Sequence, residues 1–184
     1  MKKLFVLAVV AMMATVSASA QQMFLKPMVG GTLTTLTGDV EDTKMKVGLV
    51  AGAEFGYLFS EQMGVTAGVL YTMQGCAWKD EDDKQKLDYL NIPLLFNYYV
   101  APGFALKAGV QFGFLTSAKS GSYDIKDACK KTDFSIPLGL SYEISDFVID
   151  ARYNLGLSNI AKNSGSKKAK NSVIMLTVGY KIPF

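Results

Sequence analysis

The sequence contains no histidine, and it has only two cysteines and one tryptophan among its 184 residues. The absence of histidine excludes Ser-His and Cys-His catalysis and removes the commonest metal ligand. Beyond residue 20, no apolar run is long and charge-free enough for a membrane-spanning helix. Charge of one sign is also lacking, because removing Lys2 and Lys3 from 19 basic residues leaves 17 against 16 acidic ones. This balance gives no reason to expect nucleic acid as a partner.

The first 20 residues predict a secretory signal peptide. Lys2 and Lys3 form a charged start, residues 4–16 are apolar, and residues 18–20 (ASA) are a small-residue cleavage site. Gln21 follows this site where a lipoprotein would have cysteine. We therefore expect residues 1–20 to be removed and residues 21–184 to form one domain.

Alternation with a period of two dominates the rest of the chain. It is clearest in residues 87–100, LDYLNIPLLFNYYV, where every second residue from Leu90 to Val100 is large and apolar. Such alternation predicts a strand with one apolar and one more polar face. Eight segments share the pattern: residues 23–36, 45–59, 64–78, 87–100, 104–117, 133–144, 147–158 and 171–184.

The connections between these segments alternate in length. The turns at residues 60–63, 101–103 and 145–146 are short, whereas the polar loops at 37–44, 79–86, 119–132 and 159–170 are longer. Short turns at one end and long loops at the other are the layout of an outer-membrane barrel. The sequence therefore predicts an all-β, eight-stranded antiparallel up-and-down transmembrane β-barrel in the cell outer membrane.

A soluble lipocalin-like barrel, with its apolar face inside, is the alternative fold. The polar face of the strands is rich in glycine, and its small volume suits the interior of a narrow eight-stranded barrel. A closed barrel has no edge strand, so Pro93 and Pro137 predict a bulge or a local break in the hydrogen-bond ladder.

Seven charged residues fall on the predicted inward faces, most of them within a few residues of the turns. They are Lys46, Glu54, Lys107, Glu143, Asp150, Arg152 and Lys181. Because unpaired charges in a narrow lumen are costly, we expect an ion-pair network that plugs the barrel. The functional alternative is a gate for a small channel or a proton path.

Three features fall at the predicted outer end. Cys76 and Cys129 form either a disulfide, as export allows, or two reduced thiols. The acidic residues 80–83 lack the ligand spacing of an EF-hand, so a solvated loop is favoured over a cation site. The lysine-rich residues 159–170 form either a solvated loop or a contact with lipid phosphates.

Aromatic residues cluster near the strand ends, as in the interfacial girdles of membrane barrels. Those near the turns are Tyr57, Phe59, Tyr98, Phe104 and Phe147, and those near the loops are Tyr71, Trp78 and Phe134.

Three blocks of sequence resemble the PorT-like outer-membrane β-barrel family of Bacteroidetes: YLNIPLLFNY (89–98), RYNLGLSNI (152–160) and SVIMLTVGYKIPF (172–184). The resemblance covers essentially residues 21–184 and implies an outer-membrane barrel, although Asn91 stands where the family more often has Glu or Gln. The ending of the chain also looks like the polar-x-Gly-x-x-apolar-x-aromatic signal read by the barrel-assembly machinery. Its residues are Thr177, Gly179, Ile182 and Phe184.

Together these patterns predict a non-enzymatic barrel with a plugged lumen, no cofactor or metal, and a structural or surface-interaction role. The alternatives are a channel for small solutes or ions, an accessory component of a secretion system, and a lipid-modifying enzyme. The expected partners are outer-membrane lipid, the assembly machinery during insertion, and an extracellular ligand or protein bound by the loops.

Overall fold

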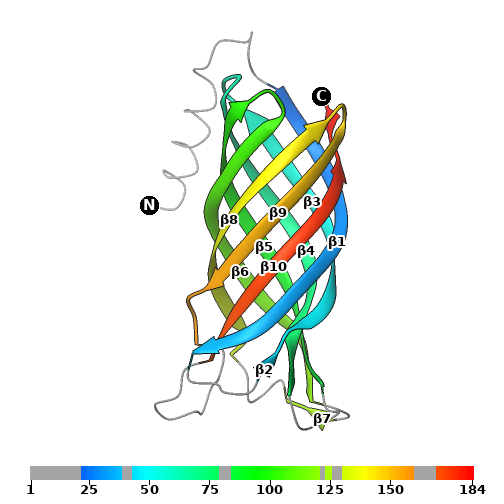
Figure 1. The fold of residues 1–184 in the computed structure, drawn as a ribbon, viewed down its shortest axis with the longest axis vertical. Coiled ribbons are helices and arrows are strands. Elements are labelled where there is room, and N and C mark those ends of the chain that lie inside the picture. The colour runs from blue at the N-terminus through cyan, green and yellow to red at the C-terminus, as the bar shows by residue number, and fades with distance from the viewer. Residues whose placement is uncertain (1–21, 39–42, 79–83, 121–122, 126–129, 160–168) are drawn as a thin grey trace, which may run out of the picture.

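A computed structural model describes residues 22–38, 43–78, 84–120, 123–125, 130–159 and 169–184. The chain forms eight long strands and three strands of two residues (Figure 1). In order they are β1 (Gln22–Gly38), β2 (Thr43–Lys44), β3 (Lys46–Leu58), β4 (Met63–Trp78), β5 (Lys84–Ala101), β6 (Phe104–Ser120), β7 (Tyr123–Asp124), β8 (Thr132–Ile144), β9 (Phe147–Gly156), β10 (Ala169–Tyr180) and β11 (Ile182–Pro183). No helix in these ranges is long and apolar enough to span a membrane.

The eight long strands close into a barrel. Each pairs antiparallel with its neighbours in the chain, and β1 completes the circle by pairing with β10 from Met28↔Gly179 to Gly38↔Ala169. The predicted eight-stranded up-and-down barrel is therefore confirmed. The predicted last strand, residues 171–184, is divided at Lys181 into β10 and β11. Strand β5 begins three residues earlier and ends one residue later than predicted, and β6 ends three residues later.

The short turns lie at the upper end of the barrel in Figure 1, and we call this the turn end; the opposite end is the loop end. Two of these turns contain a residue with positive φ, Gly103 (76°) and Ser145 (55°). Gly103 adopts this conformation without strain because it has no Cβ. The turn end is thus formed by tight connections that fix the register of each hairpin.

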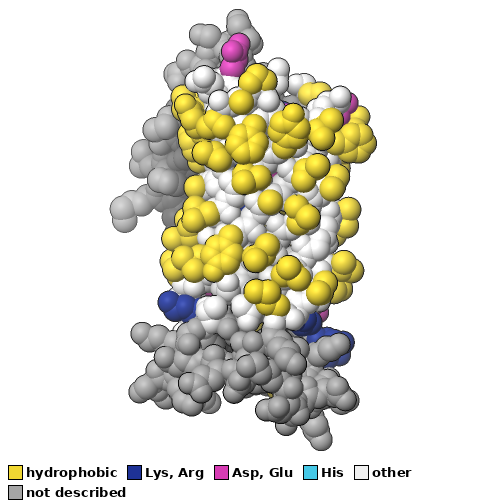
Figure 2. Space-filling view, viewed as in Figure 1, with side chains coloured by type: hydrophobic (Ala, Val, Ile, Leu, Met, Phe, Trp, Pro, Cys, Tyr) yellow, Lys and Arg dark blue, Asp and Glu magenta, His cyan; other side chains and the backbone are white. Residues whose placement is uncertain are grey.

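The two faces of the wall differ in chemistry as alternation requires. Large apolar side chains point outward and stay exposed, including Leu94, Phe96 and Val100 on β5 (Figure 2). Inward positions on the same strand hold the buried Asn91 and Asn97. So much exposed hydrocarbon is incompatible with water and suits a bilayer, which excludes the lipocalin-like orientation.

Proline positions coincide with gaps in the ladder. The β4–β5 pairing is interrupted opposite Pro93, and the β6–β8 pairing is interrupted opposite Pro137. The register is the same on both sides of each gap, so no residue is inserted. Each proline produces the predicted local break and not a bulge, because only its missing N–H is lost from the ladder.

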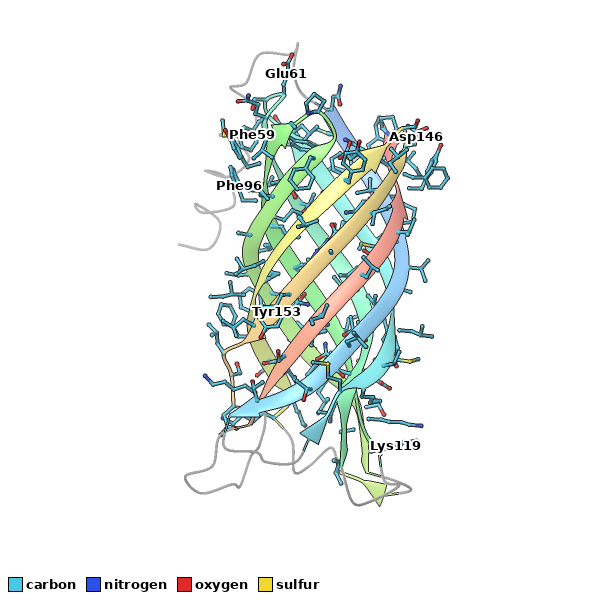
Figure 3. All side chains as sticks on the ribbon, in the orientation of Figure 1. Phe59, Glu61, Phe96, Lys119, Asp146 and Tyr153 are labelled. Carbon is cyan, nitrogen blue, oxygen red and sulfur yellow. The ribbon has the colours of Figure 1, made fainter. Side chains whose placement is uncertain are left out.

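Aromatic side chains gather toward both ends of the wall, as predicted (Figure 3). Near the turns, the ring centroids of Phe59 and Phe96 lie 6.3 Å apart, and Phe147 and Tyr180 meet edge-on at 5.3 Å. The side chain of Trp78 lies outside the described part of the structure. These bands suit the two membrane interfaces.

Candidate functional site

Five charged side chains meet inside the turn-end half of the lumen, and we call them the lumen cluster. They are Lys26, Glu54, Lys107, Asp150 and Arg152, from β1, β3, β6 and β9. Each is at most 7% exposed. Since β3 and β9 are separated by β1 and β10 in the barrel order, the cluster joins walls that the backbone ladder does not connect directly.

Arg152 lies at the centre of the cluster and holds both carboxylates. Its Nη1 lies 2.6 Å from Glu54 Oε1, and its Nε lies 2.7 Å from Asp150 Oδ1. The Nη2 group donates a second hydrogen bond to Asp150 Oδ2 at 2.9 Å. The planar guanidinium suits this arrangement because its donors form a rigid fork.

The two lysines complete the neutralisation of the carboxylates. Lys26 Nζ lies 2.8 Å from Glu54 Oε2 and 3.5 Å from Asp150 Oδ2. Lys107 Nζ pairs with the same oxygen, Asp150 Oδ2. The cluster therefore holds three cations against two anions.

Inward-facing glycines make room for the charged side chains. An added Cβ at Gly68 would lie 2.6 Å from Glu54 Cγ, one at Gly139 would lie 2.6 Å from Arg152 Cγ, and one at Gly179 would lie 2.9 Å from Lys26 Cγ. Glu54 is paired directly with Gly68, and Arg152 with Gly139. The glycine-rich inner face is thus the space into which the cluster folds.

A smaller ion pair lies at the turn-end mouth. Lys181 Nζ is 2.9 Å from Glu143 Oε2, and the Tyr99 hydroxyl donates to Glu143 Oε1 at 2.6 Å. These side chains line a pocket of about 450 Å³, and the Lys181 and Glu143 side chains are 15% and 17% exposed. This pair remains in contact with water, unlike the lumen cluster.

The seven charged residues predicted to form one network therefore lie at three places. Glu54, Lys107, Asp150 and Arg152 belong to the lumen cluster, and Glu143 and Lys181 form the mouth pair. Lys46 lies eight residues from Glu54 along β3, toward the loop end, where its Nζ donates to the Gln74 carbonyl at 2.5 Å. Lys46 is the one predicted member that lies far from the turns in the sequence, and it is too far along β3 to reach the lumen cluster.

Lys26 was missed, although it is central to the lumen cluster. It alternates with the exposed Leu25 and Val29 and shares the buried face of β1 with Phe24 and Met28. Applying the period-two reading to residues 23–36 would have placed it inside.

Uncharged side chains make most of the described side-chain hydrogen bonds in the loop-end half of the lumen. Thr72 Oγ1 accepts hydrogen bonds from Asn91 Nδ2 at 2.6 Å and from Gln74 Nε2 at 2.8 Å. Gln111 Nε2 donates to Ser135 Oγ at 3.2 Å. Between this network and the lumen cluster lies a buried apolar layer of Met28, Val50, Leu70 and Met175.

Several predicted features lie outside the described residues. These include the signal peptide, the acidic residues 80–83 and most of the lysine-rich loop. Cys129 and the side chain of Cys76 also lie outside, so the disulfide stays a prediction. In the described residues, no group of three or more Cys, Asp or Glu is placed to hold a metal ion.

The residues of the predicted assembly signal occupy both faces of the last strands. Thr177 and Gly179 face inward, whereas Ile182 and Phe184 are exposed. The Phe184 amide donates to the Met23 carbonyl at 3.0 Å, and its ring stacks on Phe55 at 6.3 Å. Recognition of these residues by the assembly machinery stays a prediction.

Comparison with solved structures finds the same barrel architecture in bacterial outer-membrane proteins. Ail of Yersinia pestis, solved with the heparin analogue sucrose octasulfate, is 19% identical with a TM-score of 0.56, over 89% of this chain and 99% of Ail. Neisserial surface protein A is 16% identical with a TM-score of 0.56, over 87% and 97% of the two chains. OprG of Pseudomonas aeruginosa is 16% identical with a TM-score of 0.53, over 89% and 96%. At these identities the likeness is one of fold.

No curated protein matches the chain significantly. A family model described as "Outer membrane protein beta-barrel domain" matches residues 16–162, which is most of the chain. Together with the closed eight-stranded barrel, this match places the protein in the outer membrane. The chain belongs to the outer membrane protein β-barrel domain family.

Proposed function

We propose that this outer-membrane protein is a closed barrel that passes no solute and that serves a structural or surface-interaction role without catalysis. The observation that carries the proposal is the lumen cluster. Its five side chains come from four strands and meet across the barrel, and small eight-stranded barrels have an interior that side chains can fill.

Two further layers support a plugged lumen. Toward the loop end, the apolar layer of Met28, Val50, Leu70 and Met175 covers the adjacent strands β10, β1, β3 and β4; its residues are at most 5% exposed, and they offer a permeating ion no polar side chain on that side of the lumen. Toward the turn end, the mouth pair narrows the entrance. An ion would have to displace paired charges and then cross this apolar layer, and both steps are unfavourable.

The same proposal includes more specific statements about the group to which the protein belongs and about its partners. They are membership of the PorT-like group, interaction with outer-membrane lipid and with the assembly machinery, and an extracellular ligand or protein bound by the loops. The competing functions are transport of small solutes or ions and service in a secretion system.

Single-channel recording in planar lipid bilayers tests the proposal. The wild-type barrel is expected to give no discrete conductance steps. The double variant Glu54→Ala/Arg152→Ala removes one cation and one anion from the lumen cluster and is expected to conduct. The matched control Glu143→Ala/Lys181→Ala makes the same change in charge at the mouth and is expected to stay silent.

Heat-modifiable gel mobility would establish that each variant is a folded barrel before it is recorded. Reproducible steps from the wild-type protein, of similar size to those of the lumen variant, would overturn the proposal and favour a transport function.

A further inference from the structure

The barrel wall contains a step between β3 and β4 near the loop end. The β3–β4 ladder starts at Val50↔Thr72, although residues 46–49 of β3 remain paired with β1. On the other side, residues 73–75 of β4 remain paired with β5. The two strands thus separate along one stretch while each keeps its other neighbour.

Side chains replace the missing ladder bonds at this step. The carbonyls of Met73 and Gly75 accept hydrogen bonds from the hydroxyls of Thr32 and Thr34, at 2.9 and 2.7 Å. The carbonyl between them, that of Gln74, accepts from Lys46 Nζ. The three successive carbonyls of residues 73–75 are therefore each satisfied by a side chain, so the step is a built feature and not a frayed edge.

Gly48 is the residue that allows the step. An added Cβ would lie 2.0 Å from the Met73 carbonyl oxygen and 2.6 Å from Thr32 Oγ1. No other residue fits this close approach without moving β4.

The step leaves a groove of about 720 Å³. It is lined by Met45, Lys46, Val47, Gly48, Leu49, Met73, Lys86 and Asp88. Val47, Met45 and Leu49 are 75%, 62% and 61% exposed, and they belong to the outward face that contacts the bilayer. The groove is thus open to lipid and apolar on its β3 side.

Two lysines lie at and beside the loop-end edge of this groove: Lys86 lines it, and Lys119 lies on the next strand, β6. Lys86 and Lys119 are directly opposite each other on β5 and β6, and both are exposed. Among the described side chains, no carboxylate forms an ion pair with either lysine. Asp88, two residues from Lys86 on β5, also lines the groove and is the acidic residue nearest to Lys86 in the sequence of this strand.

Like charges directly opposite on a sheet repel each other, so this pair favours an anion between its members. In Figure 2 the blue side chains lie just below the apolar band, and Figure 3 places Lys119 beyond it at the loop end. This is the depth of lipid headgroups in the outer leaflet, since the long loops of such barrels face outward.

We propose that the groove at the β3–β4 step binds a phosphate-bearing lipid of the outer leaflet. Its acyl chain lies along Val47, Leu49 and Met73, and its phosphate lies between Lys86 and Lys119. The acyl chain matches the apolar side chains of the groove, and the phosphate matches the two lysines. The proposal is independent of whether the lumen conducts.

Native mass spectrometry of the detergent-solubilised barrel tests this directly. We expect dioleoyl phosphatidic acid to bind with a stoichiometry of one, and dioleoylglycerol, with the same acyl chains and no phosphate, to bind at least tenfold more weakly. Inorganic phosphate at millimolar concentration should not displace the lipid.

Variants locate the site. Lys86→Glu/Lys119→Glu is expected to weaken binding of phosphatidic acid at least tenfold. The matched control Lys130→Glu/Lys131→Glu reverses two exposed lysines elsewhere at the loop end and should change it less than twofold. Val47→Asn/Leu49→Asn should also weaken binding, and gel mobility would verify folding.

Three outcomes would overturn the proposal. Equal binding of the two lipids by the wild-type barrel would remove the role of the phosphate, and this comparison needs no variant. Equal losses in both lysine variants would indicate diffuse electrostatic attraction. A lipid-independent dimer abolished by Val47→Asn/Leu49→Asn would make the groove an interface between two copies of the chain.

Discussion

The two halves of the lumen are filled by different chemistry. In the turn-end half, Arg152 reaches from β9 to Glu54 on β3, across two intervening strands. In the loop-end half, the described side-chain hydrogen bonds reach less far. They join neighbours, as between Asn91 on β5 and Thr72 on β4, or pass over one strand, as from Thr32 on β1 to the Met73 carbonyl on β4. Long charged side chains span the barrel, whereas short amides and hydroxyls reinforce the ladder locally.

This difference sets how much each half depends on a single residue. A neutral hydrogen bond lost between neighbouring strands leaves the backbone ladder intact. A charge lost from the lumen cluster leaves its partners buried and unpaired, because water does not reach them. We therefore expect stability to be concentrated in the turn-end half, and the following variants break or sharpen that expectation.

The largest effect is expected from Arg152→Ala. It leaves the Glu54 and Asp150 carboxylates short of their central cation, and losing one partner of a buried pair costs about 3–5 kcal/mol. The measurement is the free energy of unfolding in urea for the barrel in lipid vesicles. Lys130→Ala, at an exposed position outside the proposed lipid groove, is the control. A loss below about 1 kcal/mol would mean that water enters the cluster and that the halves are alike.

Gly139→Ala tests whether the cluster needs the space beside it. The new Cβ would lie 2.6 Å from both the Ala151 carbonyl oxygen and Arg152 Cγ, and such crowding costs about 1–3 kcal/mol. Gly31→Ala is a matched control, because the nearest atom to its Cβ would be the Gly48 carbonyl oxygen at 3.8 Å. Equal shifts in the urea midpoint for both variants would contradict the steric role assigned to Gly139.

Asn91→Ala probes the neutral half. It removes the donor to Thr72 Oγ1, which still accepts from Gln74, so we expect a loss of about 1 kcal/mol. The free energy of unfolding of this variant should be measured in urea under the same conditions as that of Arg152→Ala. If Asn91→Ala proved as damaging as Arg152→Ala, the comparison between the two halves would fail.

The smallest effect is expected from Lys181→Met. The mouth pair is partly exposed, and Glu143 keeps its hydrogen bond from Tyr99, so the loss should be about 1 kcal/mol or less. Repeating the unfolding at high salt sharpens the test, because screening should reduce the difference from wild type. A large loss that does not depend on salt would place this pair with the lumen cluster instead.

The sequence predicted the barrel well because alternation with turn spacing leaves few other closed folds. It also predicted that Glu54, Lys107, Asp150 and Arg152 face inward. It did not predict which of them meet, because contacts across a lumen depend on strand tilt and register, and neither is encoded in a local pattern. Lys46 and Glu54 share a face and a strand, but eight residues of β3 separate the step from the cluster.

The step itself had no sequence signal strong enough to predict it. Gly48 belongs to a series of inward glycines in β3 with Gly52 and Gly56, and nothing local distinguishes it from them. Its close approach to Met73 follows from a shift between strands, since β2 pairs with β4 one residue out of register relative to β3.

The chain order of the lumen cluster has a consequence for folding. Lys26 and Glu54 are contributed early in the chain, whereas Asp150 and Arg152 lie near its end, beside the strand that closes the barrel against β1. A half-assembled sheet therefore holds Lys26 and Glu54 without the guanidinium that joins them to the far wall. Closing so long a loop is the slow entropic step, and the cross-lumen ion pairs form only with it. Ring closure and the pairing of Arg152 with Glu54 are thus one kinetic event, and an open sheet gains none of this cross-lumen stabilisation until its last strand is in place.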